Sequence, residues 1–183
     1  MPKVSALDMR VPWRLLAEAT LTGSIVSCRR VFTIADTHFG HLKIALTRGF
    51  KDVEEHDRAL VSLWNATVNP KDTVRHLGDV YFGGAGKHGI LGALNGIKHL
   101  VMGNHDKYPL ALYQQYFNKI EGVTEYRHCV LSHMPVHPNQ FPRYERNIHG
   151  HSHSKKVDDP RYICVSAEQT NLRPVLFDTL LRQ

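Results

Sequence analysis

Short apolar runs bounded by polar and glycine residues recur along the chain and predict a series of strands. Residues 31–36, VFTIAD, combine β-branched and aromatic residues with a carboxylate at the end, which is typical of a buried strand that finishes at Asp36. The same pattern predicts further strands at residues 73–79, 98–106, 128–133, 146–151, 161–166 and 173–177. The chain is therefore expected to contain many strands.

Apolar residues at helical spacing predict a few helices between these strands. Residues 52–68 form the clearest one, because Asp52 and Glu55 have the spacing of a capping box. Most of its apolar stripe consists of Val53, Leu60, Leu63 and Trp64. Shorter helices are predicted at residues 90–94 and 109–117. Strands that alternate with helices place the chain in the α/β class.

The length and composition of the chain indicate one domain. A chain of 183 residues that is 42% hydrophobic and 22% charged can bury one sizeable core. We expect a single domain over residues 1–183, with its core in residues 31–177. Residues 1–29 are expected to form an N-terminal extension that packs on this domain. The three cysteines include no C-x-x-C pair, so we expect them to be buried, reduced thiols.

Hydropathy predicts no membrane segment. No apolar run approaches the roughly 20 residues that span a bilayer. Arg14 and Glu18 interrupt the apolar stretch at residues 11–27, which argues against a signal peptide and favours a short surface helix or strand. We therefore expect a cytoplasmic protein without a membrane partner. The net charge of +6 and the isoelectric point near 9.3 favour anionic partners such as phosphates or nucleic acid.

Side chains that can bind metals or transfer protons follow several of the predicted strands. In chain order they are Asp36 and His38, Asp79, Asn104 and His105, His133, and His151 and His153. Each position alone has an ordinary explanation, because Asp, Asn and Gly are common in turns and a histidine can simply end a strand. Together they fall at strand ends, which is where open α/β sheets place their sites.

Residues 147–154, NIHGHSHS, place three histidines at alternate positions. Alternate side chains of an extended chain point to one face, so His149, His151 and His153 present imidazoles in one direction. This arrangement fits a metal site, and it also fits a solvated polar edge. The stretch by itself leaves both interpretations open.

The order of short motifs along the chain resembles that of the calcineurin-like metallophosphoesterase family. The motifs are DTHFGH, GD, GNHD, SH and GHSH, which begin at residues 36, 78, 103, 132 and 150. The resemblance covers about residues 31–177 and is closest to compact single-domain members from bacteria and their phages. It implies a four-layer α/β/β/α sandwich of two mixed sheets flanked by helices. It also implies a dinuclear metal centre at the strand ends.

Carried over by position, the family pattern assigns seven residues to two divalent metal ions. One ion would be held by Asp36, His38, Asp79 and His153, and the other by Asp79, Asn104, His133 and His151. Asp79 would bridge them, because two dications about 3.5–4 Å apart repel unless an anion lies between them. Imidazole, carboxylate and amide ligands without thiolate suit Mn²⁺, which we expect, and also Fe, Zn²⁺, Ni²⁺ or Co²⁺. His149 is expected to be a packing or supporting residue.

The implied reaction is hydrolysis of a phosphoester, with a hydroxide that bridges the metals as the nucleophile. His105 is the candidate general acid for the leaving group, and we expect Asp106 to orient its imidazole. The candidate contacts to the substrate are His41, Asn104, Arg143 and Arg146.

The sequence favours phosphodiesters such as cyclic nucleotides, dinucleotides or nucleic-acid ends. The residues after Asp79 lack the aspartate and arginine of similar protein phosphatases, and the chain leaves little room for a cap domain. The basic and aromatic stretch at residues 137–147 suits a nucleotide or short nucleic acid, although a solvated loop explains it equally well. A small-molecule phosphomonoesterase is the first alternative. A binding scaffold of the same fold is the second, and the complete set of ligand positions argues against it. The residues do not indicate an oligomeric state.

Overall fold

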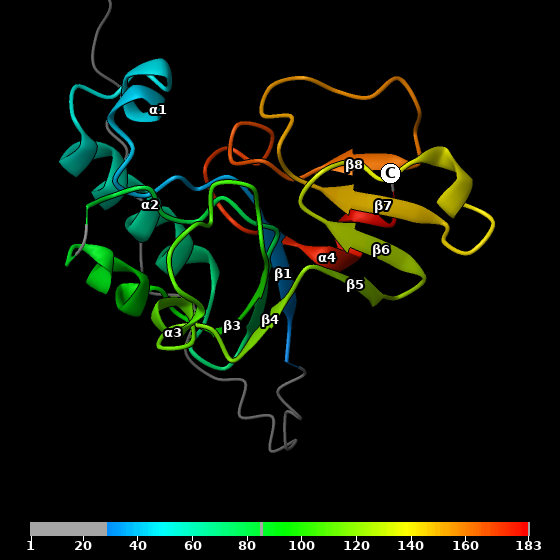
Figure 1. Ribbon diagram of the computed structural model, residues 1–183, viewed down its shortest axis with the longest axis horizontal. Coiled ribbons are helices and arrows are strands. Elements are labelled where there is room, and N and C mark those ends of the chain that lie inside the picture. The colour runs from blue at the N-terminus through cyan, green and yellow to red at the C-terminus, as the bar shows by residue number, and fades with distance from the viewer. Residues whose placement is uncertain (1–28, 85, 183) are drawn as a thin grey trace, which may run out of the picture.

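Two β-sheets form the centre of the computed structural model, which describes residues 29–84 and 86–182 (Figure 1). The strands of the first sheet are β1 (Val31–Ile34), β2 (Thr73–His76), β3 (Ile97–Val101), β4 (Lys119–Glu121) and β9 (Val175–Leu176). They lie in the order β4-β3-β2-β1-β9. Strands β1 to β4 are parallel and β9 is antiparallel to β1, so the sheet is mixed.

The second sheet is also mixed. Its strands are β5 (Val123–Tyr126), β6 (Cys129–Ser132), β7 (Arg146–His149) and β8 (Tyr162–Cys164), in that order. Strands β6, β7 and β8 are parallel, and β5 forms an antiparallel hairpin with β6. The expected α/β fold of two mixed sheets with helices is confirmed.

The helices lie mainly on the outer side of the first sheet. They are α1 (Leu42–Thr47), α2 (Val53–Thr67), α3 (Leu110–Tyr113), α4 (Phe177–Leu180) and the 3₁₀ helices η1 (His88–Ala93) and η2 (Pro138–Gln140). Helices α1 and α2 lie on the left in Figure 1, away from β5 to β8 on the right. Trp64 of α2 packs in one apolar cluster with Phe32 and Val74 of the first sheet. A second cluster, which includes Leu131, Ile148 and Phe177, fills the space between the sheets.

The observed elements differ from the predicted ones chiefly at their ends. The strands that precede the candidate metal-binding motifs end one to five residues earlier than predicted, because the last residues of each predicted strand form the loops that carry the polar side chains. The helix expected at residues 109–117 is confined to α3, and the strand expected at 173–177 ends at Leu176 because Phe177 begins α4. Helix α1 and the short strands β4 and β5 were not predicted. The capping role of Asp52 is confirmed, since its carboxylate accepts from the backbone NH of Glu55 at 2.7 Å.

Several expectations fall on residues 1–28. The N-terminal extension, apart from its last residue, and Cys28 lie outside the described residues. Cys129 is buried and Cys164 partly buried, and both are free thiols. Among residues 29–84 and 86–182, no helix has the length and hydropathy needed to cross a bilayer.

A backbone contact between the two sheets brings their carboxyl ends together. The NH of Ala35, just after β1, donates to the carbonyl of Val165 at 2.8 Å, and the NH of Ala167 donates to the carbonyl of Ala35 at 2.9 Å. Strands β1 and β8 end just before this contact, and the loops that follow them carry Asp36 and Ser166. The loops at the ends of both sheets therefore face one another across a single site.

Candidate metal centre

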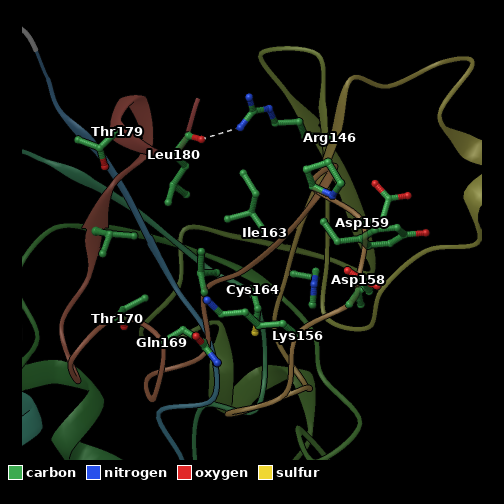
Figure 2. Close-up of a pocket in the computed structure, with 16 residues that line it drawn as sticks. Arg146, Lys156, Asp158, Asp159, Ile163, Cys164, Gln169, Thr170, Thr179 and Leu180 are labelled. Carbon is green, nitrogen blue, oxygen red and sulfur yellow. Dashed lines mark hydrogen bonds between the residues drawn. The ribbon is translucent and has the colours of Figure 1, made fainter. Parts of the chain in front are cut away.

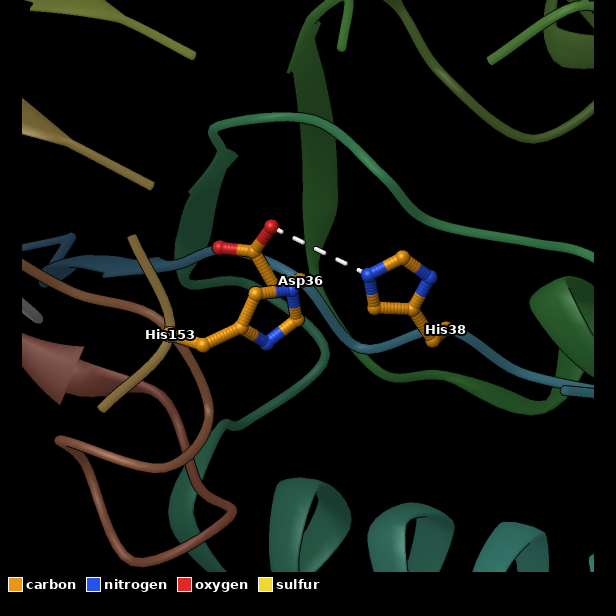
Figure 3. Close-up of side chains that lie close together, drawn as sticks. All are labelled: Asp36, His38 and His153. Atoms are coloured by element: carbon orange, nitrogen blue, oxygen red, sulfur yellow. Dashed lines mark ion pairs between the residues drawn. The ribbon is translucent and has the colours of Figure 1, made fainter. Parts of the chain in front are cut away.

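Asp36, His38 and His153 form the first group of candidate ligands. One ligand atom from each lies within 4.8 Å of the others (Figure 3). Asp36 and His38 are buried, and Oδ1 of Asp36 lies 3.9 Å from Nε2 of His38. The first sheet supplies Asp36 and His38, and the loop after β7 supplies His153.

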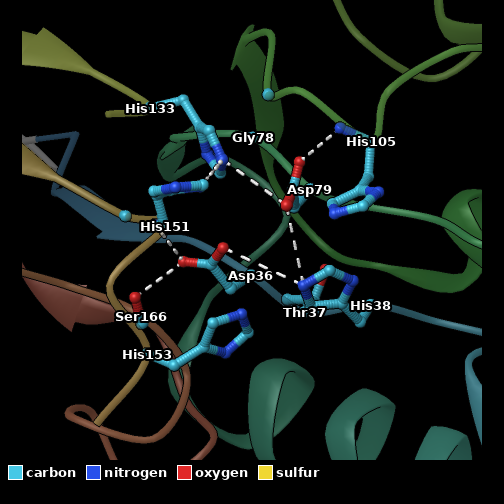
Figure 4. Close-up of polar contacts among 12 residues, drawn as sticks. Asp36, Thr37, His38, Gly78, Asp79, His105, His133, His151, His153 and Ser166 are labelled. Carbon is cyan, nitrogen blue, oxygen red and sulfur yellow. Dashed lines mark hydrogen bonds and ion pairs between the residues drawn. The ribbon is translucent and has the colours of Figure 1, made fainter. Parts of the chain in front are cut away.

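Asp79, His133 and His151 form the second group, within the same limit of 4.8 Å. Asn104 joins it, because its side-chain oxygen lies 2.9 Å from Nε2 of His133. In Figure 4 the carboxylates of Asp36 and Asp79 lie at the centre of the cluster, with the imidazoles around them. The structure therefore brings together all seven side chains that the family pattern assigns to metals.

Asp79 lies between the two groups. Its Oδ2 is 3.7 Å from Nε2 of His38 in the first group and 3.4 Å from Nε2 of His133 in the second. Its Oδ1 accepts from the backbone NH of His105 at 2.9 Å, which fixes the plane of the carboxylate. One oxygen of Asp79 thus faces donors from both groups.

Five of the seven candidate ligands have left-handed backbone conformations. Their φ values are 56° for Asp36, 51° for His38, 55° for Asp79, 65° for His151 and 50° for His153. This region costs roughly 1–2 kcal/mol for a residue with a Cβ atom. Such conformations persist where the surroundings impose them, and they concentrate at functional sites. The backbone is therefore held in a less favourable form that directs these side chains inward.

Asp106 holds part of this backbone in place. Its carboxylate accepts from the backbone NH groups of Asp79 and Val80, both at 2.9 Å, and of Gly103 at 2.8 Å. These bonds tie the loop after β2 to the loop after β3. Backbone donors engage both of its oxygens, so Asp106 positions Asp79. The expectation that Asp106 also orients the imidazole of His105 stays a prediction.

The loops after β2 and β3 also approach each other closely. A Cβ atom on Gly103 would lie 2.2 Å from Oδ1 of Asp79, and one on Gly78 would lie 2.6 Å from the nitrogen of Gly103. Glycine is therefore required at both positions for the Asp79 carboxylate to reach the centre of the site.

Several buried polar atoms in the first group lack a hydrogen-bond partner. Oδ2 of Asp36 accepts from the hydroxyl of Ser166 at 2.7 Å and from the NH of His151 at 2.9 Å. Its Oδ1 has no donor, and neither ring nitrogen of His38 has a partner. Buried polar atoms are almost always satisfied, so these three atoms fit the role of ligands to a cation. An ion with oxygen and imidazole ligands fits the residues present.

Supporting hydrogen bonds determine which histidine nitrogen is free to bind a metal. Nδ1 of His133 donates to the carbonyl of Leu77 at 2.8 Å, and Nδ1 of His153 donates to Oε1 of Glu168 at 2.9 Å. Carbonyls and carboxylates only accept, so the proton of each ring is on Nδ1 and the lone pair of Nε2 is available. Metal-binding histidines in proteins are usually oriented in this way.

Arg48 links these supporting groups to the DTH loop, residues 36–38. Its buried guanidinium donates to the carbonyls of Asp36 at 2.6 Å and Thr37 at 3.0 Å, and to Oε1 of Glu168 at 2.8 Å. Arg48, Ser166 and Glu168 were not identified from the sequence, because they belong to no motif. Ser166 alone had a usable signal, since it lies at the end of a predicted strand.

Burial and neighbouring charges affect the carboxylates differently. Burial is the largest influence on Asp36 and raises its pKa to about 6. Burial also acts on Asp79, but the adjacent His133 and the backbone NH of His105 outweigh it and lower the pKa to about 2. Burial lowers the pKa of His38 to about 3, which keeps its imidazole neutral. A neutral imidazole and an ionised bridging carboxylate are the forms that bind cations.

The remaining candidates lie around this centre. The half-exposed ring of His105 lies 5.9 Å from that of His38. Nδ1 of His41 accepts from the backbone NH of Ile44 at 3.4 Å, which caps α1 and leaves the proton on Nε2. The exposed guanidinium of Arg143 lies 5.6 Å from the ring of Tyr144.

Arg146 does not reach the metal centre. It lies on the same face of β7 as Ile148, and its Nη1 donates to the carbonyl of Leu180 on α4 at 2.8 Å. It lines a separate cavity of about 640 Å³ near α4 (Figure 2). The expected contact between Arg146 and substrate is therefore wrong. His149 is buried, is absent from both ligand groups, and its Nδ1 lies 2.8 Å from the carbonyl of Gly150.

A groove of about 690 Å³ begins at the second ligand group. Asn104 and His133 are among the residues that line it. Residues that line the rest include Val123, Met134, Gln140 and Tyr144. Val123 and Met134 are largely exposed, so the groove offers apolar surface directly beside the candidate ligands.

The family model of the calcineurin-like phosphoesterases matches residues 29–183. The chain belongs to this family. It is 32% identical to the uncharacterized protein MJ1445 of Methanocaldococcus jannaschii, over 86% of this chain and 92% of the relative. It is 28% identical to the gene 66 protein of Mycobacterium phage D29, over 75% of this chain and 87% of the relative. The crystal structure of a protein of unknown function, AQ665 from Aquifex aeolicus, is also similar, with a TM-score of 0.68 and 26% identity over 84% of this chain and 98% of that one.

Family membership and the two ligand groups together support metal-dependent hydrolysis of phosphoesters. The family's divalent ions agree with the donor set, which contains imidazole, carboxylate and amide groups and no thiolate.

Proposed function

We propose that this protein is a phosphodiesterase with two divalent metal ions. The observation that carries the proposal is the position of Asp79, whose Oδ2 faces His38 of one ligand group and His133 of the other. A carboxylate shared by two groups of metal-binding donors is the arrangement that stabilises two cations close together. Asp36, His38, Asp79 and His153 would hold one ion, and Asp79, Asn104, His133 and His151 the other.

The preference for diesters rests on the groove beside Asn104 and His133. A phosphomonoester has one organic substituent, whereas a diester has two that must both be accommodated. The groove provides apolar surface for one of them next to the second ion site. Tyr144 in its lining and the exposed Arg143 nearby suit the base and phosphate of a nucleotide or short nucleic acid.

Divalent ions at these ligands supply binding to the phosphoryl oxygens and activation of water near neutral pH, and Mn²⁺ is our first choice among them. The protein supplies the proton transfers around them. His105 is the candidate general acid, because its ring is partly exposed beside the ligand groups while its backbone NH is fixed on Asp79. Nε2 of His41 carries a proton and can donate to a phosphoryl oxygen.

The test is hydrolysis by metal-stripped protein to which Mn²⁺, Ni²⁺, Zn²⁺ or Mg²⁺ is returned. Bis(p-nitrophenyl) phosphate and p-nitrophenyl phosphate are compared at equal concentration, with the metal content measured in parallel. We expect turnover that depends on added metal and is faster with the diester. Preference for the monoester would make a small-molecule phosphatase the better description. Folded, metal-loaded protein that hydrolyses neither compound would favour a binding scaffold.

A further inference from the structure

Phe82 exposes an aromatic ring beside the metal centre. Its side chain is 44% exposed, although it lies three residues after the buried Asp79. The ring lies 4.2 Å from that of His41, at a tilt of 32°, and 5.5 Å from that of His105. Both histidines also flank His38, at 5.6 and 5.9 Å between ring centroids. Single exposed apolar residues are common on proteins, so this location is what distinguishes Phe82.

The backbone holds Phe82 in this position. Its NH donates to the carbonyl of Phe39 at 2.7 Å, which ties it to the residue that follows the DTH loop. The next residue, Gly83, packs against Gly40 so closely that a Cβ atom on Gly40 would lie 2.6 Å from the Cα of Gly83. This glycine contact allows the two loops to touch and places the ring of Phe82 next to that of His41.

We propose that Phe82, backed by His41, is a stacking platform for a planar base or aryl group of the substrate. This inference rests on the proposed function and specifies its substrate class. A phenyl ring supported from one side by an imidazole presents its exposed surface for stacking, and stacking on aromatic side chains accepts any base.

The platform and the groove serve different ends of a diester. The groove begins at Asn104 and His133, which belong to the second ligand group, whereas Phe82 contacts the histidines around His38 in the first group. Because His105 is the candidate acid for the leaving group and contacts Phe82, the platform holds the substituent that leaves. The groove is then free for the second substituent of a diester, whereas the single substituent of a monoester occupies the platform.

The experiment compares two ligands that differ only in the base. Binding of adenosine 5′-monophosphate and of ribose 5-phosphate to Mn²⁺-loaded protein is measured by titration calorimetry. We expect the nucleotide to bind more tightly to the natural protein by roughly 5- to 100-fold, the usual contribution of one stacked base. Phe82→Ala and Phe82→Leu should remove this preference and leave ribose 5-phosphate binding unchanged. Phe82→Trp should keep it.

Leu46→Ala is the matched control, because Leu46 is 52% exposed on α1 and its loss should change neither affinity. Equal affinity of the natural protein for the two ligands would overturn the platform, as would a Phe82→Leu variant that retains the preference. Hydrolysis of bis(p-nitrophenyl) phosphate is measured separately, so that the platform and the proposed function can fail independently. A base preference that depends on Phe82 in a protein without diester turnover would overturn the proposed function and leave the platform standing.

Discussion

Nδ1 of His153 and Oε1 of Glu168 lie 2.9 Å apart, and the same oxygen of Glu168 accepts from Arg48. The buried Arg48 also binds the backbone carbonyls of Asp36 and Thr37. A change in Glu168 therefore reaches both the orientation of His153 and the support of the DTH loop. The hydrogen bond from His153 and the charge of Arg48 outweigh burial and lower the pKa of Glu168 to about 2. Glu168 is thus ionised at neutral pH.

Glu168→Gln should weaken metal binding without removing any candidate ligand. Loss of such a supporting group typically costs about 10- to 100-fold in metal affinity. We expect a loss of this size for one of two ions when Mn²⁺ is titrated by calorimetry. Glu125→Gln, at an exposed position on β5, is the control. Unchanged affinity for both ions in the Glu168 variant would show that His153 needs no support.

Asp106→Asn should affect stability more than proton transfer. An amide has only one acceptor oxygen for the three backbone NH groups that Asp106 now satisfies. A buried donor left without an acceptor costs about 1–3 kcal/mol, and each kcal/mol lowers the melting temperature by about 2–4 °C in a chain of this size. Thermal unfolding measures the loss. If Asp106 instead oriented His105, the pH profile of kcat would shift while the melting temperature stayed constant.

Asp36→Asn should stabilise the metal-free protein at neutral pH. Burial raises the pKa of Asp36 from 3.8 to about 6, so the folded state binds this proton more tightly than the unfolded state does. Its contribution to stability is present below about pH 4 and is lost as the pH rises through 6. The shift corresponds to at most about 3 kcal/mol. Thermal unfolding in chelator at pH 4.5 and 7.5 should show a larger advantage of the variant at the higher pH. Equal melting temperatures at pH 7.5 would mean that the Asp36 carboxylate is not destabilising.

His105→Ala should retain both metal ions and lose roughly 10²- to 10⁴-fold in kcat, the usual contribution of a general acid. The loss should be larger for an alkyl or nucleoside leaving group than for p-nitrophenolate, which needs less protonation. His88→Ala on η1 removes a comparable imidazole and serves as the control. The assignment fails if the variant remains fully active on the poorer leaving group.

The strand ends explain how much of the site could be anticipated. Apolar runs that stop at a carboxylate or histidine, as at Asp36 and His133, identify strands and their terminal side chains together. Parallel strands then bring those ends to one edge. The structure groups these side chains accordingly, whereas their binding of metal is a prediction that metal titration will test.

The residues that support the site carry no comparable signal. Arg48 follows a six-residue helix and Glu168 lies in a turn, so neither has a period or motif that marks it. Arg146 was misplaced for a related reason, because a basic residue in a polar stretch gives no indication of which face of β7 it will occupy. Strands β4 and β5 have three and four residues, too few for alternation to separate them from loop.

The hydrogen bond from Ser166 to Asp36 connects residues that are 130 positions apart. This separation along the chain determines when the two ends of the site become available during synthesis. Asp36, His38, Asp79 and Asn104 follow strands of the first sheet. The other three candidate ligands, His133, His151 and His153, follow β6 and β7 and are synthesised later. A nascent chain therefore carries only four of the seven candidate ligands until most of it has emerged from the ribosome. Contacts of such long range form late in folding. Under the proposed function, capture of the metal pair would coincide with closure of the two sheets, and a bound metal pair would mark a chain that has finished folding.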